Sequence, residues 1–170
     1  MKFFSGFSFE NESFLFKQFI NSSQFTVSGF SFGAILAFEY VLHSKDRIDT
    51  LQLFSPAFFQ NKPRRFLRTQ LIYFQKDKKE YINNFVENSF FPNEISENIA
   101  IKIGKYEDLN KLLNFEWNKD YLKKIIKKGI KIEIFLGAQD KIIDSDLAFD
   151  FFQEFGEVCL IKNVGHTLST

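Results

Sequence analysis

A serine between two glycines is the feature of this chain best suited to chemistry. Residues 29–33 read Gly-Phe-Ser-Phe-Gly, and they follow the β-type run 25–27 and precede the helical stretch 34–40. A GxSxG sequence at a strand-to-helix turn lets the backbone turn tightly and exposes the serine hydroxyl. The context therefore predicts that Ser31 is a nucleophile.

A serine hydroxyl needs a neighbouring base to take its proton, and a third group must hold that base in the correct tautomer. The chain has two histidines. His43 lies where the helix after Ser31 is expected to end, a place typical of surface histidines. His166 follows the last expected strand, where enzymes with the chain order serine, aspartate, histidine carry the base. We therefore predict that His166 is the base.

The acid of such a site should lie in the turn after the preceding strand, and Asp140 occupies that turn. Asp144 and Asp146 are close alternatives. Asp144 is better placed to cap the next helix, which is a common structural role of aspartate. Asp140 is therefore the predicted acid.

Negative charge that develops on a substrate oxygen must meet preorganised donors. The usual pair is the backbone N–H after the nucleophile and one from the loop after an early strand, which here are those of Phe32 and Phe7. Gly6 permits the loop to turn its amides inward. Ser5 is an alternative contact for the substrate.

The elements that must position these groups alternate along the chain. Strands are expected at 2–4, 25–28, 50–54, 130–136 and 157–161, and helices from 31 to about 43 and from about 144 to 155. A further helix is expected after Asn11, which can cap it, because apolar residues at 14, 16, 19 and 20 recur at roughly helical spacing. Residues 57–128 are charged, aromatic and nearly free of glycine, which predicts a helical lid. The order predicts an α/β fold: a truncated α/β-hydrolase of about five mostly parallel strands flanked by helices, with the lid between the third and fourth strands.

Composition limits the classes of function. At 170 residues the chain suits one domain, so residues 1–170 are expected to form a single unit. Lysine and arginine (22) nearly balance aspartate and glutamate (21), so net charge favours neither nucleic acid nor an anionic membrane as a partner. The single cysteine, Cys159, is expected in the core. With no leader or membrane-spanning run, a cytoplasmic protein is expected, without cofactor or metal.

Several stretches spread over the whole chain carry a resemblance to a known family, namely residues 3–7, 27–34, 53–56, 74–77, 132–137 and 140–142. They resemble the BioV-type pimeloyl-acyl-carrier-protein methyl ester esterases, short α/β-hydrolases of biotin synthesis. The resemblance implies that Ser31 is the nucleophile, Asp140 the acid and His166 the base. It also implies hydrolysis of a methyl ester through an acyl-enzyme on Ser31, with release of methanol and pimeloyl carrier protein.

Relative to a full α/β-hydrolase, three strands are expected to be missing: the first, second and fourth. These lie together on one side of the sheet, so five contiguous strands can still form. A histidine common before the glycine of the oxyanion loop is Ser5 here, and the usual C-terminal helix is not expected after His166. Alternative functions are cleavage of the thioester to the carrier protein, general short-chain carboxylesterase activity, or a non-catalytic binding module.

The arginines are unevenly distributed. Three of the four, Arg64, Arg65 and Arg68, lie at the start of the expected lid. Arginine binds carboxylates and phosphate bidentately, and an acyl carrier protein presents an acidic helix beside its phosphopantetheine. We predict that these residues bind the carrier, chiefly Arg64 and Arg68, which share one helical face. The alternative is a solvated charge run after Pro63.

Overall fold

The computed structural model describes residues 1–169 and contains one five-stranded sheet. All strands are parallel and lie in chain order: β1 (Lys2–Phe4), β2 (Thr26–Phe30), β3 (Thr50–Phe54), β4 (Lys131–Gly137) and β5 (Glu157–Ile161). Every residue of β2 and β3 is buried, as expected for central parallel strands covered on both faces. The predicted contiguous five-stranded sheet is confirmed.

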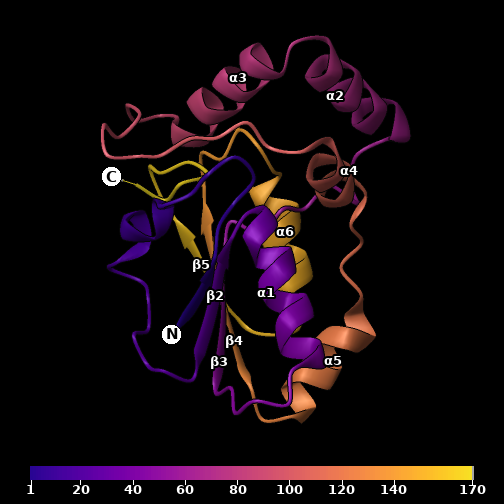
Figure 1. Ribbon diagram of the computed structural model, residues 1–170. Coiled ribbons are helices and arrows are strands. Elements are labelled where there is room, and N and C mark those ends of the chain that lie inside the picture. The colour runs from indigo at the N-terminus through magenta and orange to yellow at the C-terminus, as the bar shows by residue number, and fades with distance from the viewer. Residues whose placement is uncertain (170) are drawn as a thin grey trace.

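Helices cover the two faces of the sheet unequally. Figure 1 shows α1 (Phe32–His43) and α6 (Ser145–Phe152) on one face, and the short 3₁₀ helix η1 (Glu12–Phe16) on the other. Phe16 of η1 stacks on Phe54 of β3 with ring centroids 4.7 Å apart. Phe54 in turn stacks on Phe135 of β4 at 5.2 Å. The face without long helices is thus filled by aromatic rings.

The first expected helix is much shorter than its apolar spacing indicated. Asn11 makes no side-chain cap, and the helix ends at Phe16. The Asn11 side chain instead bonds a distant segment: it donates to the Asn98 carbonyl (2.8 Å) and accepts from the Ala100 N–H (2.6 Å). The predicted cap is therefore wrong, because tertiary partners 87 and 89 residues away occupy the amide.

The segment 57–128 contains four helices: α2 (Arg64–Lys76), α3 (Lys78–Phe90), α4 (Tyr106–Asn114) and α5 (Lys119–Lys127). In Figure 1, α2 and α3 lie across one end of the sheet with α4 beside them, whereas α5 lies near α1 toward the other end. Trp117, between α4 and α5, binds the start of the segment, since its indole N–H donates to the Ala57 carbonyl (2.9 Å). The helices that cover this end of the sheet are therefore α2, α3 and α4.

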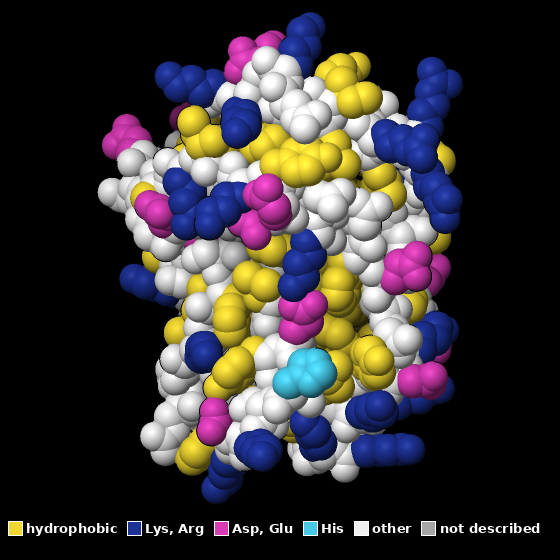
Figure 2. Space-filling model, turned by 45° about the vertical axis from the view of Figure 1, so that its right-hand side comes forward, with side chains coloured by type: hydrophobic (Ala, Val, Ile, Leu, Met, Phe, Trp, Pro, Cys, Tyr) yellow, Lys and Arg dark blue, Asp and Glu magenta, His cyan; other side chains and the backbone are white. Residues whose placement is uncertain are grey.

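Surface features are less distinctive. Figure 2 shows lysine and arginine interspersed with aspartate and glutamate on the face it presents, in line with the balanced composition. Cys159 is exposed, so its predicted burial is wrong. It lies on β5, an edge strand, where one side of the ladder has no neighbour to cover it. None of the helices in residues 1–169 is long and apolar enough to cross a membrane.

Candidate active site

Ser31 lies at the sharp turn between β2 and α1. Its backbone has a positive φ of 53° with ψ of −113°, an unfavourable conformation for a residue other than glycine. Neither Gly29 nor Gly33 has a positive φ. They are needed for close approach: a Cβ on Gly29 would overlap the Gly33 carbonyl oxygen, and one on Gly33 would overlap that of Phe4. The glycines thus provide space, while the serine itself makes the turn.

His166 lies against Ser31 although 135 residues separate them. Its Nε2 atom is 2.9 Å from Ser31 Oγ, and its ring packs on Phe30 with centroids 5.1 Å apart. The side chain is fully buried, and Ser31 is only 3% exposed. His43, at the end of α1, is exposed. Of the two histidines, the structure places only His166 beside the nucleophile.

Asp140 holds the other side of the imidazole. One carboxylate oxygen, Oδ1, accepts from the backbone N–H groups of Ile142 (2.7 Å) and Ile143 (3.0 Å). The other, Oδ2, lies 2.6 Å from His166 Nδ1. A carboxylate only accepts, so Nδ1 carries the proton and Nε2 is free to receive the proton of Ser31.

The alternative aspartates are placed elsewhere. Asp144 caps α6 by accepting from the Leu147 N–H (3.1 Å), the role expected for it. Asp146 is exposed in the first turn of the same helix. The structure therefore brings Asp140, and neither alternative, to the histidine.

The two predicted oxyanion donors adjoin the nucleophile. Phe32 is the first residue of α1, so its N–H has no partner within the helix. The N–H of Phe7 donates no hydrogen bond within residues 1–169. The loop that carries Phe7 lies against the turn at Ser31, because Gly33 touches the Phe4 carbonyl and Phe7 lines the same cavity as Ser31. Neither amide thus has a hydrogen-bond partner within residues 1–169.

Comparison with solved structures gives the same architecture. An esterase from Exiguobacterium antarcticum superposes with a TM-score of 0.64 at 18% identity, over 83% of this chain and 59% of that one. A bromoperoxidase from Bacillus anthracis gives 0.65 at 16% identity, over 91% and 64%. Carboxylesterase CesB from Bacillus subtilis gives 0.61 at 12%, over 84% and 53%.

The chain has an α/β-hydrolase fold. It spans between about half and two thirds of the length of these three proteins. No protein-family model matches the sequence, and no curated protein matches it. The fold is therefore shown by the structure, and the predicted truncated α/β-hydrolase is confirmed.

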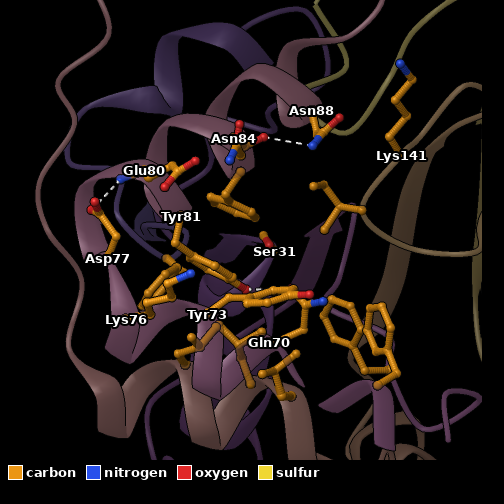
Figure 3. A pocket seen from close by; sticks show the side chains of 18 residues that line it. Ser31, Gln70, Tyr73, Lys76, Asp77, Glu80, Tyr81, Asn84, Asn88 and Lys141 are labelled. Atoms are coloured by element: carbon orange, nitrogen blue, oxygen red, sulfur yellow. Dashed lines mark hydrogen bonds between the residues drawn. The ribbon is translucent and has the colours of Figure 1, made fainter. Parts of the chain in front are cut away.

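A cavity of about 520 Å³ lies between the end of the sheet that carries Ser31 and the helices α2, α3 and α4. Figure 3 shows Ser31 at its centre, surrounded by polar side chains of α2 and α3. Tyr81 donates to Gln70 Oε1 across the two helices (3.1 Å). Burial raises the pKa of Tyr81 to about 12, so its phenol stays protonated at neutral pH. Apolar lining comes from Phe7, Phe59, Phe66, Phe85, Leu112 and Ile142.

A second hollow of about 570 Å³ lies between α2 and α4 and carries the arginines. Arg64 and Arg68 line it, whereas Arg65 does not. This hollow, called here the arginine groove, shares Phe59 and Leu113 with the cavity of Ser31. Within residues 1–169, none of the three arginines forms an ion pair. Arg64 and Arg68 thus lie on one face of α2, as their spacing predicts, and Arg65 lies outside the groove.

Glu12 is a buried acidic residue that the sequence did not reveal. It is fully buried, and its Oε1 accepts the N–H of Gly6 (2.6 Å) while Oε2 has no partner. Burial raises the pKa of its carboxyl. The Gly6 N–H, its own backbone N–H, the Ser5 hydroxyl and Lys102 oppose this more weakly, and Lys102 itself pairs with Glu10 (3.2 Å). Glu10 and Glu12 lie in the same polar and aromatic stretch, so no local signal shows which one is buried.

The raised pKa predicts a pH-dependent contribution of Glu12 to stability. Its ordinary pKa is 4.5, and the folded value is higher, so ionisation costs the folded state more than the unfolded state. As pH rises from below 4.5 through the folded pKa, the wild type should lose stability relative to Glu12→Gln. Urea unfolding of both proteins across this range measures the difference. Parallel stability curves would contradict the prediction.

Proposed function

We propose that this protein is a serine esterase that hydrolyses the methyl ester of pimeloyl-[acyl-carrier protein], giving pimeloyl-[acyl-carrier protein] and methanol in biotin biosynthesis. The observation that carries the esterase activity is the hydrogen-bond chain from Ser31 through His166 to Asp140, at the cavity between sheet and helices. The pimeloyl substrate rests on the family resemblance, with support from the cavity and the arginine groove.

The arrangement suits two acyl-transfer steps. Ser31 Oγ attacks the ester carbonyl while His166 Nε2 takes its proton, and His166 then gives that proton to the departing methoxide. The acyl group is left on Ser31. Water attacks this acyl-enzyme with His166 again as base, which releases the free carboxylate. Asp140 stabilises the imidazolium in both steps, and the amides of Phe7 and Phe32 are proposed to bind the oxyanion.

The cavity and the arginine groove favour a long substrate that is apolar near the ester bond and polar at the end away from it. Apolar side chains around Ser31 suit a methylene chain, whereas the polar residues of α2 and α3 suit a thioester and the amides that follow it. The arginine groove adjoins this cavity and can meet the phosphate and acidic helix of a carrier protein. A small free ester would use neither polar feature.

Mass spectrometry of a carrier-bound pimeloyl methyl ester tests the proposal. Loss of the methyl group alone, with the acyl chain still on the carrier, is the expected result. Release of the whole acyl chain would instead identify a thioesterase. An intact substrate, together with cleavage of small esters, would limit the activity to that of a general carboxylesterase.

The groove predicts an effect on the carrier-bound substrate alone. Replacing both Arg64 and Arg68 by glutamate should raise KM for the carrier-bound ester, more strongly at low salt, because the variant repels the acidic carrier. Hydrolysis of a p-nitrophenyl ester should be unchanged. Steady-state kinetics on both substrates at two salt concentrations measures this.

Arg65 provides the matched control, since it lies on α2 but outside the groove. Arg65→Glu changes charge by the same amount per residue and should have the smaller effect on KM. Equal losses on both substrates would indicate a misfolded helix layer. An unchanged KM in the double variant would eliminate the docking role.

A further inference from the structure

The carboxylate of Glu12 lies beneath the loop that connects β1 to η1. Its Oε1 accepts the Gly6 N–H at 2.6 Å. The side chain is fully buried and comes from the first residue of η1. Gly6 directly precedes Phe7, the residue whose amide is the second proposed oxyanion donor.

Gly6 is held by hydrogen bonds at both its N–H and its carbonyl, and its carbonyl shares a peptide with the Phe7 N–H. On one side, Glu12 binds the N–H of Gly6. On the other, the Gly6 carbonyl, which belongs to the same peptide plane as the Phe7 N–H, accepts from the Phe9 N–H at 3.2 Å. Because glycine rotates freely about φ and ψ, these two contacts decide where the Phe7 N–H points.

The carboxylate itself is firmly anchored. Phe16, at the other end of η1, packs on Phe30 and Phe54 with centroid distances of 5.0 and 4.7 Å. At the start of η1, Asn11 bonds Asn98 and Ala100. The same segment binds the loop directly, since the Lys102 N–H donates to the Ser8 carbonyl at 2.9 Å.

A buried carboxyl is a destabilising way to close a turn. Its second oxygen, Oε2, has no hydrogen-bond partner, and burial of such a group without full pairing costs free energy. An amide would accept the same N–H without an ionisable group. A buried ionisable group beside a reactive centre is a candidate for a function in that centre.

We propose that Glu12 is a positioning residue of the oxyanion site, which acts through Gly6 to direct the Phe7 N–H toward the substrate oxygen at Ser31. It does not touch the substrate. The inference rests on the proposed function, because an oxyanion forms only if Ser31 attacks a carbonyl. Glu12 would then hold the oxyanion loop in a chain that has Ser5 where related enzymes often have a histidine.

Three variants test the proposal in the intact chain. Glu12→Leu removes the acceptor, and Glu12→Gln keeps an acceptor oxygen without charge. Glu10→Leu is the matched control, because it makes the same change at an exposed neighbour that pairs with Lys102 and does not bind Gly6. The measurements are kcat and KM for a p-nitrophenyl ester, the rate of Ser31 labelling by a fluorophosphonate, and Tm.

Glu12→Leu should lower kcat and the labelling rate by up to about 10²-fold, the lower range for loss of one oxyanion donor, with KM unchanged. Glu12→Gln should restore most of the rate. Glu10→Leu should leave kcat unchanged and Tm nearly so, because an exposed ion pair contributes little to stability. If Glu12→Leu fails to fold, Glu12→Asp replaces it, because its shorter side chain withdraws the carboxylate from Gly6 and should also lower kcat.

Different failures have different signatures. A wild-type protein that is not labelled at Ser31 would refute the proposed function itself. Labelling of the wild type with an unchanged kcat in folded Glu12→Leu or Glu12→Asp would overturn the role of Glu12 alone. Equal losses of kcat in Glu12→Leu and Glu10→Leu would also overturn it, since removal of any acidic side chain from this segment would then account for the effect.

Discussion

Replacing Ser31 or His166 by alanine is expected to lower kcat by about 10⁶-fold, and Asp140→Asn by about 10⁴-fold. Ser31 supplies the attacking oxygen, and His166 accepts its proton across 2.9 Å. Asp140→Asn presents an amide where His166 Nδ1 now meets a carboxylate at 2.6 Å, which favours the wrong tautomer. Kinetics on a carrier-bound methyl ester and on a p-nitrophenyl ester measure these losses.

The three groups act as one unit, so their effects should not add. The double variant Ser31→Ala with His166→Ala should be no slower than either single variant. Asp144→Ala is the matched control, because Asp144 caps α6 and does not reach His166. It should lose about 0.5–2 kcal/mol of stability at full kcat. A near-normal rate in Asp140→Asn, or fluorophosphonate labelling of Ser31→Ala, would refute the assignment.

Gly6→Val is expected to lower kcat by about 10²- to 10³-fold, equivalent to about 2.7–4 kcal/mol for one lost oxyanion donor. A Cβ at Gly6 would lie 2.7 Å from Cδ1 of Phe30 and 3.3 Å from the Phe30 carbonyl oxygen. The loop must therefore move, and the Phe7 N–H moves with it. Stopped-flow measurement of the acylation step tests this directly.

Gly129→Ala is a suitable control for this prediction. Gly129 has a φ of +81°, but no heavy atom lies within 4 Å of the position that a Cβ would take there, so alanine strains the backbone without displacing a neighbour. The substitution should lower Tm and leave kcat unchanged. Wild-type kcat in a folded Gly6→Val protein would remove the loop from the mechanism.

Elements with strong local signals were predictable from the sequence. The strands 50–54 and 157–161 have the expected bounds, and α1 ends at His43 as its helical pattern indicated. Asp144 is the predicted cap of α6, because capping depends on residues within one helical turn. In each case the determining interactions are close in sequence, or depend on a hydrophobic period that the sequence displays.

Features that depend on distant partners were not predictable in this way. Asn11 resembles a helix cap in sequence, but its amide binds residues 98 and 100. Cys159 lies in an apolar run, yet its strand is at the edge of the sheet and the side chain is exposed. Burial depends on which elements pack together, and an apolar run alone does not reveal this.

Sequence patterns alone identify the candidates for the chemistry. Ser31 is marked by its glycines and its place between strand and helix, and Asp140 and His166 are marked by their order after later strands. That these three side chains meet depends on how the strands pair in the folded chain. Parallel strands place their carboxyl ends at one edge of the sheet, so turns that are 135 and 26 residues apart converge there. The burial of Glu12 under the oxyanion loop also depends on the tertiary structure, because that contact exists only once η1 packs on the sheet.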